Sequence, residues 1–177
     1  MGNWIAQAIG FAGLILAILS FQKKERNGIL FFQIMASLAY FVHFLLLGAV
    51  TGAIMNLLGA TRNYIFSNQE KGWAGKPFWL YLFIAVYVLA AALTWKGPYS
   101  LLPMAGMIVG TVSFWIKDPK VTRLVFLLSP PCWFMYNLIS GSIPGMATEI
   151  FTAASILVGI IRFDLRKRPS PMDSEYH

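Results

Sequence analysis

Continuous apolar runs, separated by short polar stretches, are the dominant pattern along the chain. The runs hold about 15 to 19 residues, which at about 1.5 Å per residue approaches a hydrocarbon core of about 30 Å. The runs do not alternate apolar and polar positions, so helices are expected rather than the strands of a barrel. The pattern predicts seven membrane-spanning helices, at residues 4–21, 29–47, 52–66, 78–95, 101–116, 124–139 and 145–161.

Composition agrees with an integral membrane protein of all-α class. Of the 177 residues, 58% are hydrophobic and only 12% are charged, whereas soluble domains carry about 25% charged residues. The first run is interpreted as a retained helix rather than a cleaved signal, because basic residues follow it and none precedes it. Cys132 is the only cysteine, which excludes an intrachain disulfide.

Basic residues predict the topology. Thirteen of the 14 Lys and Arg residues fall on one side, in the loops after the first, third and fifth spans or after the seventh span, with Arg62 counted there because it lies near the end of the third span. Lys96 alone falls on the other side. Cytoplasmic segments collect Lys and Arg, so the N-terminus is expected outside, in the periplasm or extracellular space, and the C-terminus in the cytoplasm. Topology also explains the net charge of +7, and nucleic acid is not expected as a partner.

An internal repeat is predicted from a constant offset of 93 residues, which aligns residues 11–60 with residues 104–153 without a gap. AGLILAILSF at 12–21 corresponds to AGMIVGTVSF at 105–114, and Gly48 and Gly52 correspond to Gly141 and Gly145. We expect two parallel three-helix bundles joined by a linker helix, a 3+1+3 architecture. The divisions are 1–67, 68–98 with the linker span at about 78–95, 99–163, and a basic tail at 164–177 that is expected to be disordered.

Polar side chains inside the predicted spans are the candidates for function, because lipid excludes such groups. Glu149 and Asn56 occupy the same position in the two copies of the repeat, and so do Trp133 and Tyr40. Two aromatic and polar pairs are therefore expected to converge on one central cavity. The candidate solute-binding residues are Tyr40, Asn56, Trp133, Glu149, His43 and Asn137.

Two of these residues have alternative interpretations. Glu149 could face the cavity, lie near the outer interface at a helix N-terminus, or pair with Arg62. An unpaired carboxyl group in the cavity would make proton coupling a hypothesis. His43 could be a packed, hydrogen-bonded histidine or part of a proton relay.

Three segments carry a resemblance to a known family: VHFLLLG at 42–48, LLPMAGMIVGTVSFW at 101–115 and CWFMYNLISGSIPGMATE at 132–149, with IIRF following at 160–163. They resemble the YgjV family of bacterial inner-membrane proteins over nearly the whole chain. That family is similar in organisation to the SWEET, semiSWEET and PQ-loop superfamily, in which a triplet, a linker helix and a second triplet follow one another. The resemblance implies a multi-pass protein of the bacterial inner membrane.

The sugar-transporting SWEETs pair a tryptophan on the second helix of a triplet with an asparagine on the third. The resemblance assigns these roles to Trp133 and Asn56, while Tyr40 and Glu149 depart from the pattern. The proline of the superfamily's hinge is also replaced, and the mid-span prolines are Pro130 and Pro131.

A SWEET-like facilitator or carrier of a small polar solute is the function we expect. The alternative is a membrane scaffold or regulator that uses the same fold without transporting. No catalytic, metal or cofactor site is expected, because the chain has two histidines, no HExxH motif, no cysteine cluster and no phosphate-binding glycine loop. Membrane lipid and a small polar solute are the expected partners, and a homo-oligomer is left open.

Overall fold

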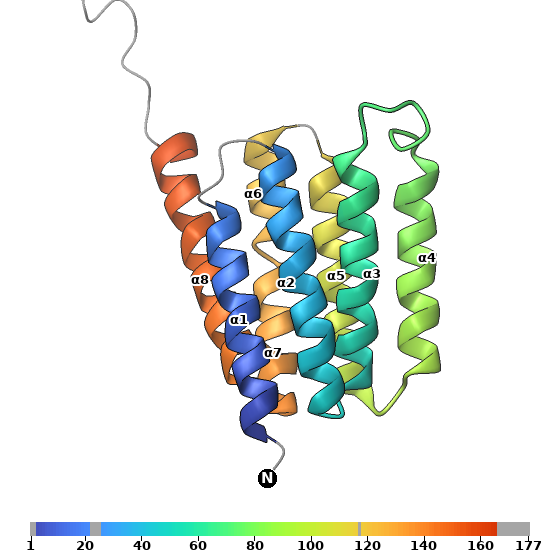
Figure 1. Ribbon diagram of the computed structural model, residues 1–177. Coiled ribbons are helices and arrows are strands. Elements are labelled where there is room, and N and C mark those ends of the chain that lie inside the picture. Colours follow the sequence, from blue (N-terminus) through green and yellow to red (C-terminus); the bar gives the residue numbers. More distant parts are fainter. Residues whose placement is uncertain (1–2, 22–25, 117, 166–177) are drawn as a thin grey trace, which may run out of the picture.

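The computed structural model describes residues 3–21, 26–116 and 118–165, and these residues form helices without any β-strand. Figure 1 shows the helices side by side as rods that alternate in direction. The α-helices are α1 (Asn3–Phe21), α2 (Arg26–Leu46), α3 (Val50–Ser67), α4 (Phe78–Leu93), α5 (Leu101–Trp115), α6 (Pro119–Phe126), α7 (Ser129–Ser140) and α8 (Ile143–Gly159). A 3₁₀ turn, η1 (Pro98–Ser100), precedes α5, and a π-helix, η2 (Ile160–Leu165), continues α8. The all-helical class predicted from the sequence is confirmed.

The sixth predicted span, 124–139, is not one continuous helix. It divides into α6 and α7, which are separated by Leu127 and Leu128. Pro130 and Pro131 explain the break, because a proline lacks the N–H that an interior helical residue donates and its ring clashes with the preceding turn. The two prolines instead fall in the first turn of α7, where proline is tolerated.

Residues 164 and 165, the first two of the predicted tail, belong to η2, and residues 166–177 lie outside the described residues.

The molecule has two distinct ends. The end at which α1, α3, α5 and α8 terminate is called the basic end, because the sequence places all Lys and Arg residues except Lys96 on this side (Figure 1). The glycine end is where the α2–α3 and α7–α8 turns lie, and there Gly48 and Gly141 adopt φ of 70° and 68°. Only glycine adopts this left-handed conformation readily, so both turns require it.

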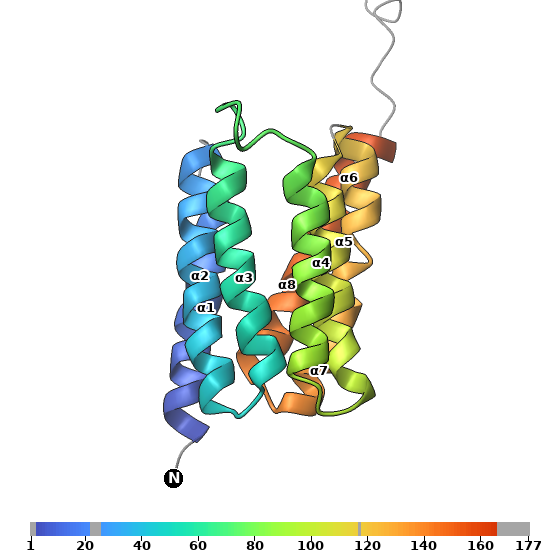
Figure 2. The same ribbon diagram turned by 90° about the vertical axis from the view of Figure 1, so that its right-hand side faces the viewer.

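The helices pack in two groups. In the first group α2 contacts both α1 and α3, and in the second α7 contacts both α5 and α8. The groups meet where α1 contacts α8 and where α3 contacts α5, while α4 packs on α3 and α5. Figure 2 shows α1, α2 and α3 on one side and α4, α5 and α6 on the other.

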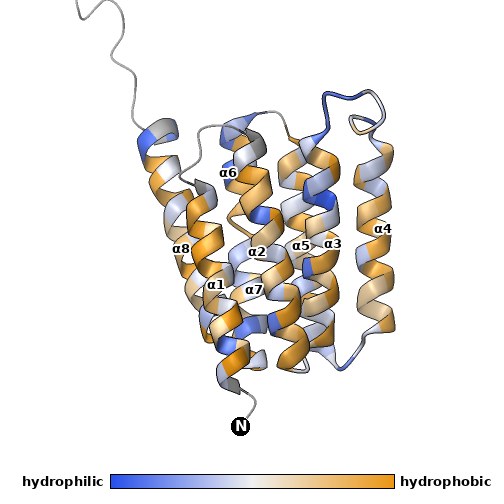
Figure 3. Cartoon of the chain, in the orientation of Figure 1, coloured by the Kyte–Doolittle hydropathy of each residue, from blue (hydrophilic) through white to orange (hydrophobic). Residues whose placement is uncertain are grey.

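The outer surface is apolar and the interior holds polar side chains. Leu93 on α4 and Val158 on α8 are among the exposed apolar residues, at 77% and 61% exposure, whereas Asn63, Thr111 and Asn137 are buried. Figure 3 shows hydrophobic residues along the length of α4, with a hydrophilic loop connecting α3 to it. An apolar exterior of this kind is suited to lipid.

Individual helices differ in how well they match a spanning length. In the described part of the chain, the stretches Gly28–Leu46 and Ile143–Arg162 are long and apolar enough to cross a membrane by themselves. Trp4–Ser20 and Phe78–Leu93 are apolar but shorter.

Candidate functional site

A cavity of about 450 Å³ lies between the two groups of helices. Its lining comes from α1, α2, α3, α5, α6, α7 and α8, and α4 contributes no residue to it. Five of the six residues predicted as candidates line this cavity: Tyr40, Asn56, Trp133, Asn137 and Glu149. The structure thus brings together side chains that are up to 109 positions apart in the sequence, and His43 is the candidate that it leaves out.

One face of α8 supplies four polar residues to the lining. Gly145, Thr148, Glu149, Thr152 and Ser155 recur at intervals of three or four residues and therefore share one face of the helix. Glu149 is partly exposed on this face. Among residues 3–21, 26–116 and 118–165, no hydrogen bond or ion pair reaches its carboxylate, so the charge of this group is not compensated by the described protein.

Two asparagines line the same cavity. Asn56 donates from Nδ2 to the backbone oxygen of Gly52 at 2.9 Å, which leaves its Oδ1 as an acceptor. Asn137 is 1% exposed, and its Oδ1 has no hydrogen-bond partner among the described residues. Gly145 lies against this amide, and a β-carbon at position 145 would collide with it. A buried acceptor without a donor is uncommon in proteins.

Aromatic rings form the wall opposite these acceptors. Phe44 stacks on Trp133 with centroids 6.2 Å apart, and the centroids of Tyr40 and Phe44 are 6.0 Å apart. The Tyr40 hydroxyl contacts Thr148 Oγ1 at 2.5 Å and donates to the backbone oxygen of Pro144 at 3.2 Å. Tyr40 therefore ties α2 to α8 and presents its ring to the cavity.

Hydrogen bonds between the two groups of helices close the cavity at the glycine end. His43 on α2 contacts Ser142 Oγ, just before α8, at 2.7 Å, and also contacts the backbone oxygen of Ala6 at 2.6 Å. Tyr136 on α7 accepts from the backbone N–H of Gly52, at the start of α3, at 2.8 Å. Gln7 Nε2 on α1 donates to the backbone oxygen of Gly141 at 2.7 Å. The bond of His43 to Ala6 joins α2 to α1 within the first group, whereas the bonds to Ser142, Gly52 and Gly141 each join one group to the other.

His43 takes the packed alternative of the two considered from the sequence. Both ring nitrogens have partners, the side chain is fully buried, and the residue does not line the cavity. Sequence reasoning missed its partner Ser142 and the matching role of Tyr136. The available signal was Ser142 itself, a helix N-cap residue two positions before Pro144.

Arg62 does not form the ion pair with Glu149 that was considered from the sequence. Its Nε and Nη2 donate to Asn63 Oδ1 at 3.2 and 2.9 Å, and its Nη1 donates to Thr111 Oγ1 at 3.0 Å. The guanidinium also lies over the Phe114 ring, 5.2 Å from its centroid. Arg62 borders the same cavity, six residues or about 9 Å along α3 from Asn56 in the direction of the basic end.

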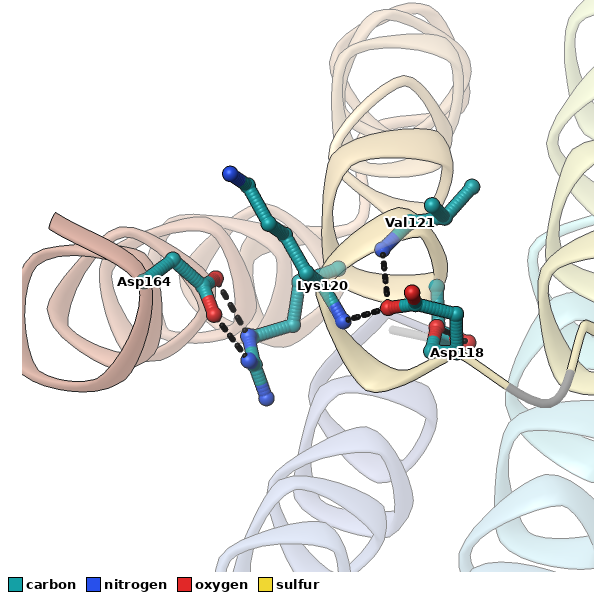
Figure 4. Close-up of polar contacts among 6 residues, drawn as sticks. Asp118, Lys120, Val121 and Asp164 are labelled. Atoms are coloured by element: carbon teal, nitrogen blue, oxygen red, sulfur yellow. Dashed lines mark hydrogen bonds and ion pairs between the residues drawn. The ribbon is translucent and has the colours of Figure 1, made fainter.

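An ion pair joins α6 to η2 beyond the predicted spans at the basic end. Arg123 Nε donates to Asp164 Oδ2 at 2.9 Å, and this bond holds the pKa of the Asp164 carboxyl below its usual range. Figure 4 shows Asp164 beside α6 and, just before the start of α6, Asp118 accepting from the backbone N–H groups of Lys120 and Val121. Asp118 caps α6, and Arg123 lines the cavity.

No metal site emerges from the described ranges, because no three His, Cys, Asp or Glu side chains there come together in a way that could hold an ion. The arrangement is instead that of a small chamber with an acidic group, amide acceptors and aromatic rings. Such a mixture of apolar surface and a few convergent polar groups is typical of small-molecule sites.

Comparison with known proteins gives one match. The family model Imp-YgjV, described as a bacterial inner membrane protein, matches residues 4–167. No curated protein and no solved structure matches the chain.

Proposed function

The chain belongs to the Imp-YgjV family of bacterial inner membrane proteins, and on that premise we propose that it is a carrier or facilitator of a small polar solute. The central cavity is the observation that carries the proposal. Its volume of about 450 Å³ falls within the range of small-molecule sites, about 300 to 1,000 Å³. A membrane scaffold has no need for an uncompensated carboxylate in a chamber of this size.

The proposal includes a SWEET-like organisation of two parallel three-helix bundles with α4 as the linker. The turn geometry supports it. Gly48 N–H and Ala49 N–H bond to Leu45 O and Phe44 O, and the bonds at the offset of 93 residues, from Gly141 and Ser142 to Leu138 and Asn137, repeat this pattern. The pairing of helices between the groups, α1 with α8 and α3 with α5, is the pairing that a two-fold axis along the membrane normal would generate.

Alternate opening of the two bundles is the proposed mechanism. The cavity runs from Gly145, near the start of α8, to Ser20 and Arg123, near the basic end. The bonds made by His43, Tyr136 and Gln7 close the glycine end. Basic loops favour a cytoplasmic location, so this conformation is assigned to the inward-facing state, and rocking of the bundles would break the glycine-end bonds to expose the cavity outside.

Solute uptake by purified protein in liposomes tests the proposal. A panel of sugars, amino acids and small amines is offered, and at least one solute is expected to enter faster than into protein-free liposomes. Glu149→Gln is expected to reduce that rate because it removes the cavity's carboxylate. Glu70→Gln, in the exposed loop before α4, removes an acidic group elsewhere and is expected to transport normally. If no solute enters faster than into protein-free liposomes, the carrier proposal is wrong and the scaffold alternative is favoured.

A further inference from the structure

Two acceptors that lack donors lie toward the glycine end of the cavity. The Glu149 carboxylate has no partner among the described residues, and neither has the buried Oδ1 of Asn137. Asn137 lies against Gly145, which precedes Glu149 by four residues, or about 6 Å along one face of α8. A solute that binds here must therefore supply hydrogen-bond donors, and a positive charge would compensate the carboxylate.

Aromatic rings beside these acceptors add to the preference for a cation. Phe44 and Trp133 are stacked, and both line the cavity. The electron-rich faces of such rings attract cations. The Tyr40 hydroxyl is already bonded to Pro144 and Thr148, so it adds ring surface rather than a free donor.

Arg62 does not neutralise this region. Its guanidinium is held by Asn63 and Thr111 and lies over Phe114. Its position on α3 is about 9 Å nearer the basic end than that of Asn56. Since charge interactions weaken with distance, Glu149 is the dominant charge toward the glycine end of the cavity.

We propose that the solute is a small protonated primary amine. Its ammonium group donates to the Glu149 carboxylate, and its carbon atoms pack on Phe44 and Trp133. A neutral polyol would leave the carboxylate uncompensated, and an anion would be repelled by it. A quaternary ammonium group would satisfy the rings but has no N–H for the acceptors. That the amine is transported rests on the proposed function, whereas its binding does not.

Calorimetric titration of the purified full-length protein tests the amine preference directly. The probes are ethanolamine hydrochloride, choline chloride, glycerol and sodium glycolate, which share a small hydroxylated skeleton and differ in charge and in N–H donors. Ethanolamine is expected to bind at least about tenfold more tightly than choline, as loss of a charge-assisted hydrogen bond would produce. Glycerol and glycolate are expected to give no binding heat.

Variants locate the site. Glu149→Gln is expected to weaken ethanolamine binding by about tenfold to a hundredfold. This substitution breaks no side-chain hydrogen bond or ion pair within the described residues, so the variant is expected to fold, and thermal unfolding checks this. Glu70→Gln is the matched control and is expected to bind ethanolamine as the unmodified chain does.

Three results would overturn the inference: no binding of ethanolamine, equally tight binding of glycerol or glycolate, or unchanged ethanolamine affinity in Glu149→Gln. The uptake measurement separates this inference from the proposed function. If liposomes containing the protein take up a sugar while ethanolamine neither binds nor enters, the amine inference fails and the carrier proposal stands. If ethanolamine binds with the expected pattern and no solute crosses the membrane, the inference stands and the carrier proposal fails.

Discussion

Single residues show most clearly what the sequence could and could not predict. Pairing Asn56 with Glu149 and Tyr40 with Trp133 through the repeat was sufficient to select four residues that line one cavity. The packed role of His43 was one of two alternatives, but its partners could not be predicted, because Ala6 and Ser142 lie 37 and 99 residues away and are brought to it only by tertiary packing. A polar residue in an apolar run signals a buried partner without identifying it.

Gly106 provides a test of packing at the scale of one residue. A β-carbon at this position would lie 2.6 Å from Trp133 Cδ1, so Gly106→Ala must displace the indole ring that lines the cavity. We expect it to lower the free energy of unfolding by about 1 to 3 kcal/mol, the range for overpacking in a close-packed interior. Thermal or denaturant unfolding in detergent measures the change.

Gly72→Ala is the control for Gly106→Ala. Gly72 has no heavy atom within 4 Å of the added carbon, so its substitution is expected to change the free energy of unfolding by less than about 0.5 kcal/mol. Equal stability of Gly106→Ala and Gly72→Ala would contradict the close approach of α5 to the Trp133 ring.

At the scale of elements, helix positions followed from the apolar runs, while helix continuity did not. Most predicted spans agree with the observed helices to within about three residues, because a membrane-length apolar run leaves few alternatives to a helix. The division between α6 and α7 was missed, although Pro130 and Pro131 marked it. The prediction of one span at 124–139 gave more weight to the apolar composition of this segment than to the backbone N–H groups that the two prolines lack.

The ion pair between α6 and η2 yields a prediction at this scale. The ion pair lowers the pKa of Asp164 in the folded protein. The stabilisation that the carboxylate contributes is therefore fully present above the ordinary aspartate pKa of about 3.9. It is lost only as the pH falls through the lower pKa of the folded state. Hydrogen exchange of residues 160–165, corrected for the intrinsic effect of pH, is therefore expected to show the same protection at pH 7 and pH 5.

Asp164→Asn removes the charge that Arg123 binds and is expected to give a few-fold faster exchange in residues 160–165 at both pH values, as loss of a surface ion pair would produce. Glu70→Gln, in the loop before α4, is expected to leave this exchange unchanged. If hydrogen-exchange protection of residues 160–165 in the unmodified chain decreases from pH 7 to pH 5, the ion pair does not hold η2.

At the scale of the whole molecule, the features that matter are the separation of two helix groups and the cavity between them. The alternation of basic and non-basic loops predicted which loops lie at the same end of the molecule. The prediction of a bacterial inner membrane protein family is confirmed by the match over residues 4–167. The order in which helices neighbour one another could not be derived from apolar runs, since lipid-facing and helix-facing apolar surfaces have the same composition. It depends on close contacts at small residues, such as that of Gly13 with the Tyr40 ring.

Accessibility of α8 to water-soluble thiol reagents tests the central claim, that a wet cavity between the helix groups opens toward the basic end. Cysteine is introduced at Thr152, which lines the cavity, or at Ile150, which is 61% exposed on the outer surface, in a Cys132→Ser background. On the proposed topology, with the basic end in the cytoplasm, a membrane-impermeant reagent is expected to label Thr152→Cys in inside-out vesicles and much more slowly in right-side-out vesicles. Ile150→Cys is expected to stay unlabelled in both, because it faces lipid. Labelling of Thr152→Cys that is as slow as that of Ile150→Cys from both sides would contradict the cavity.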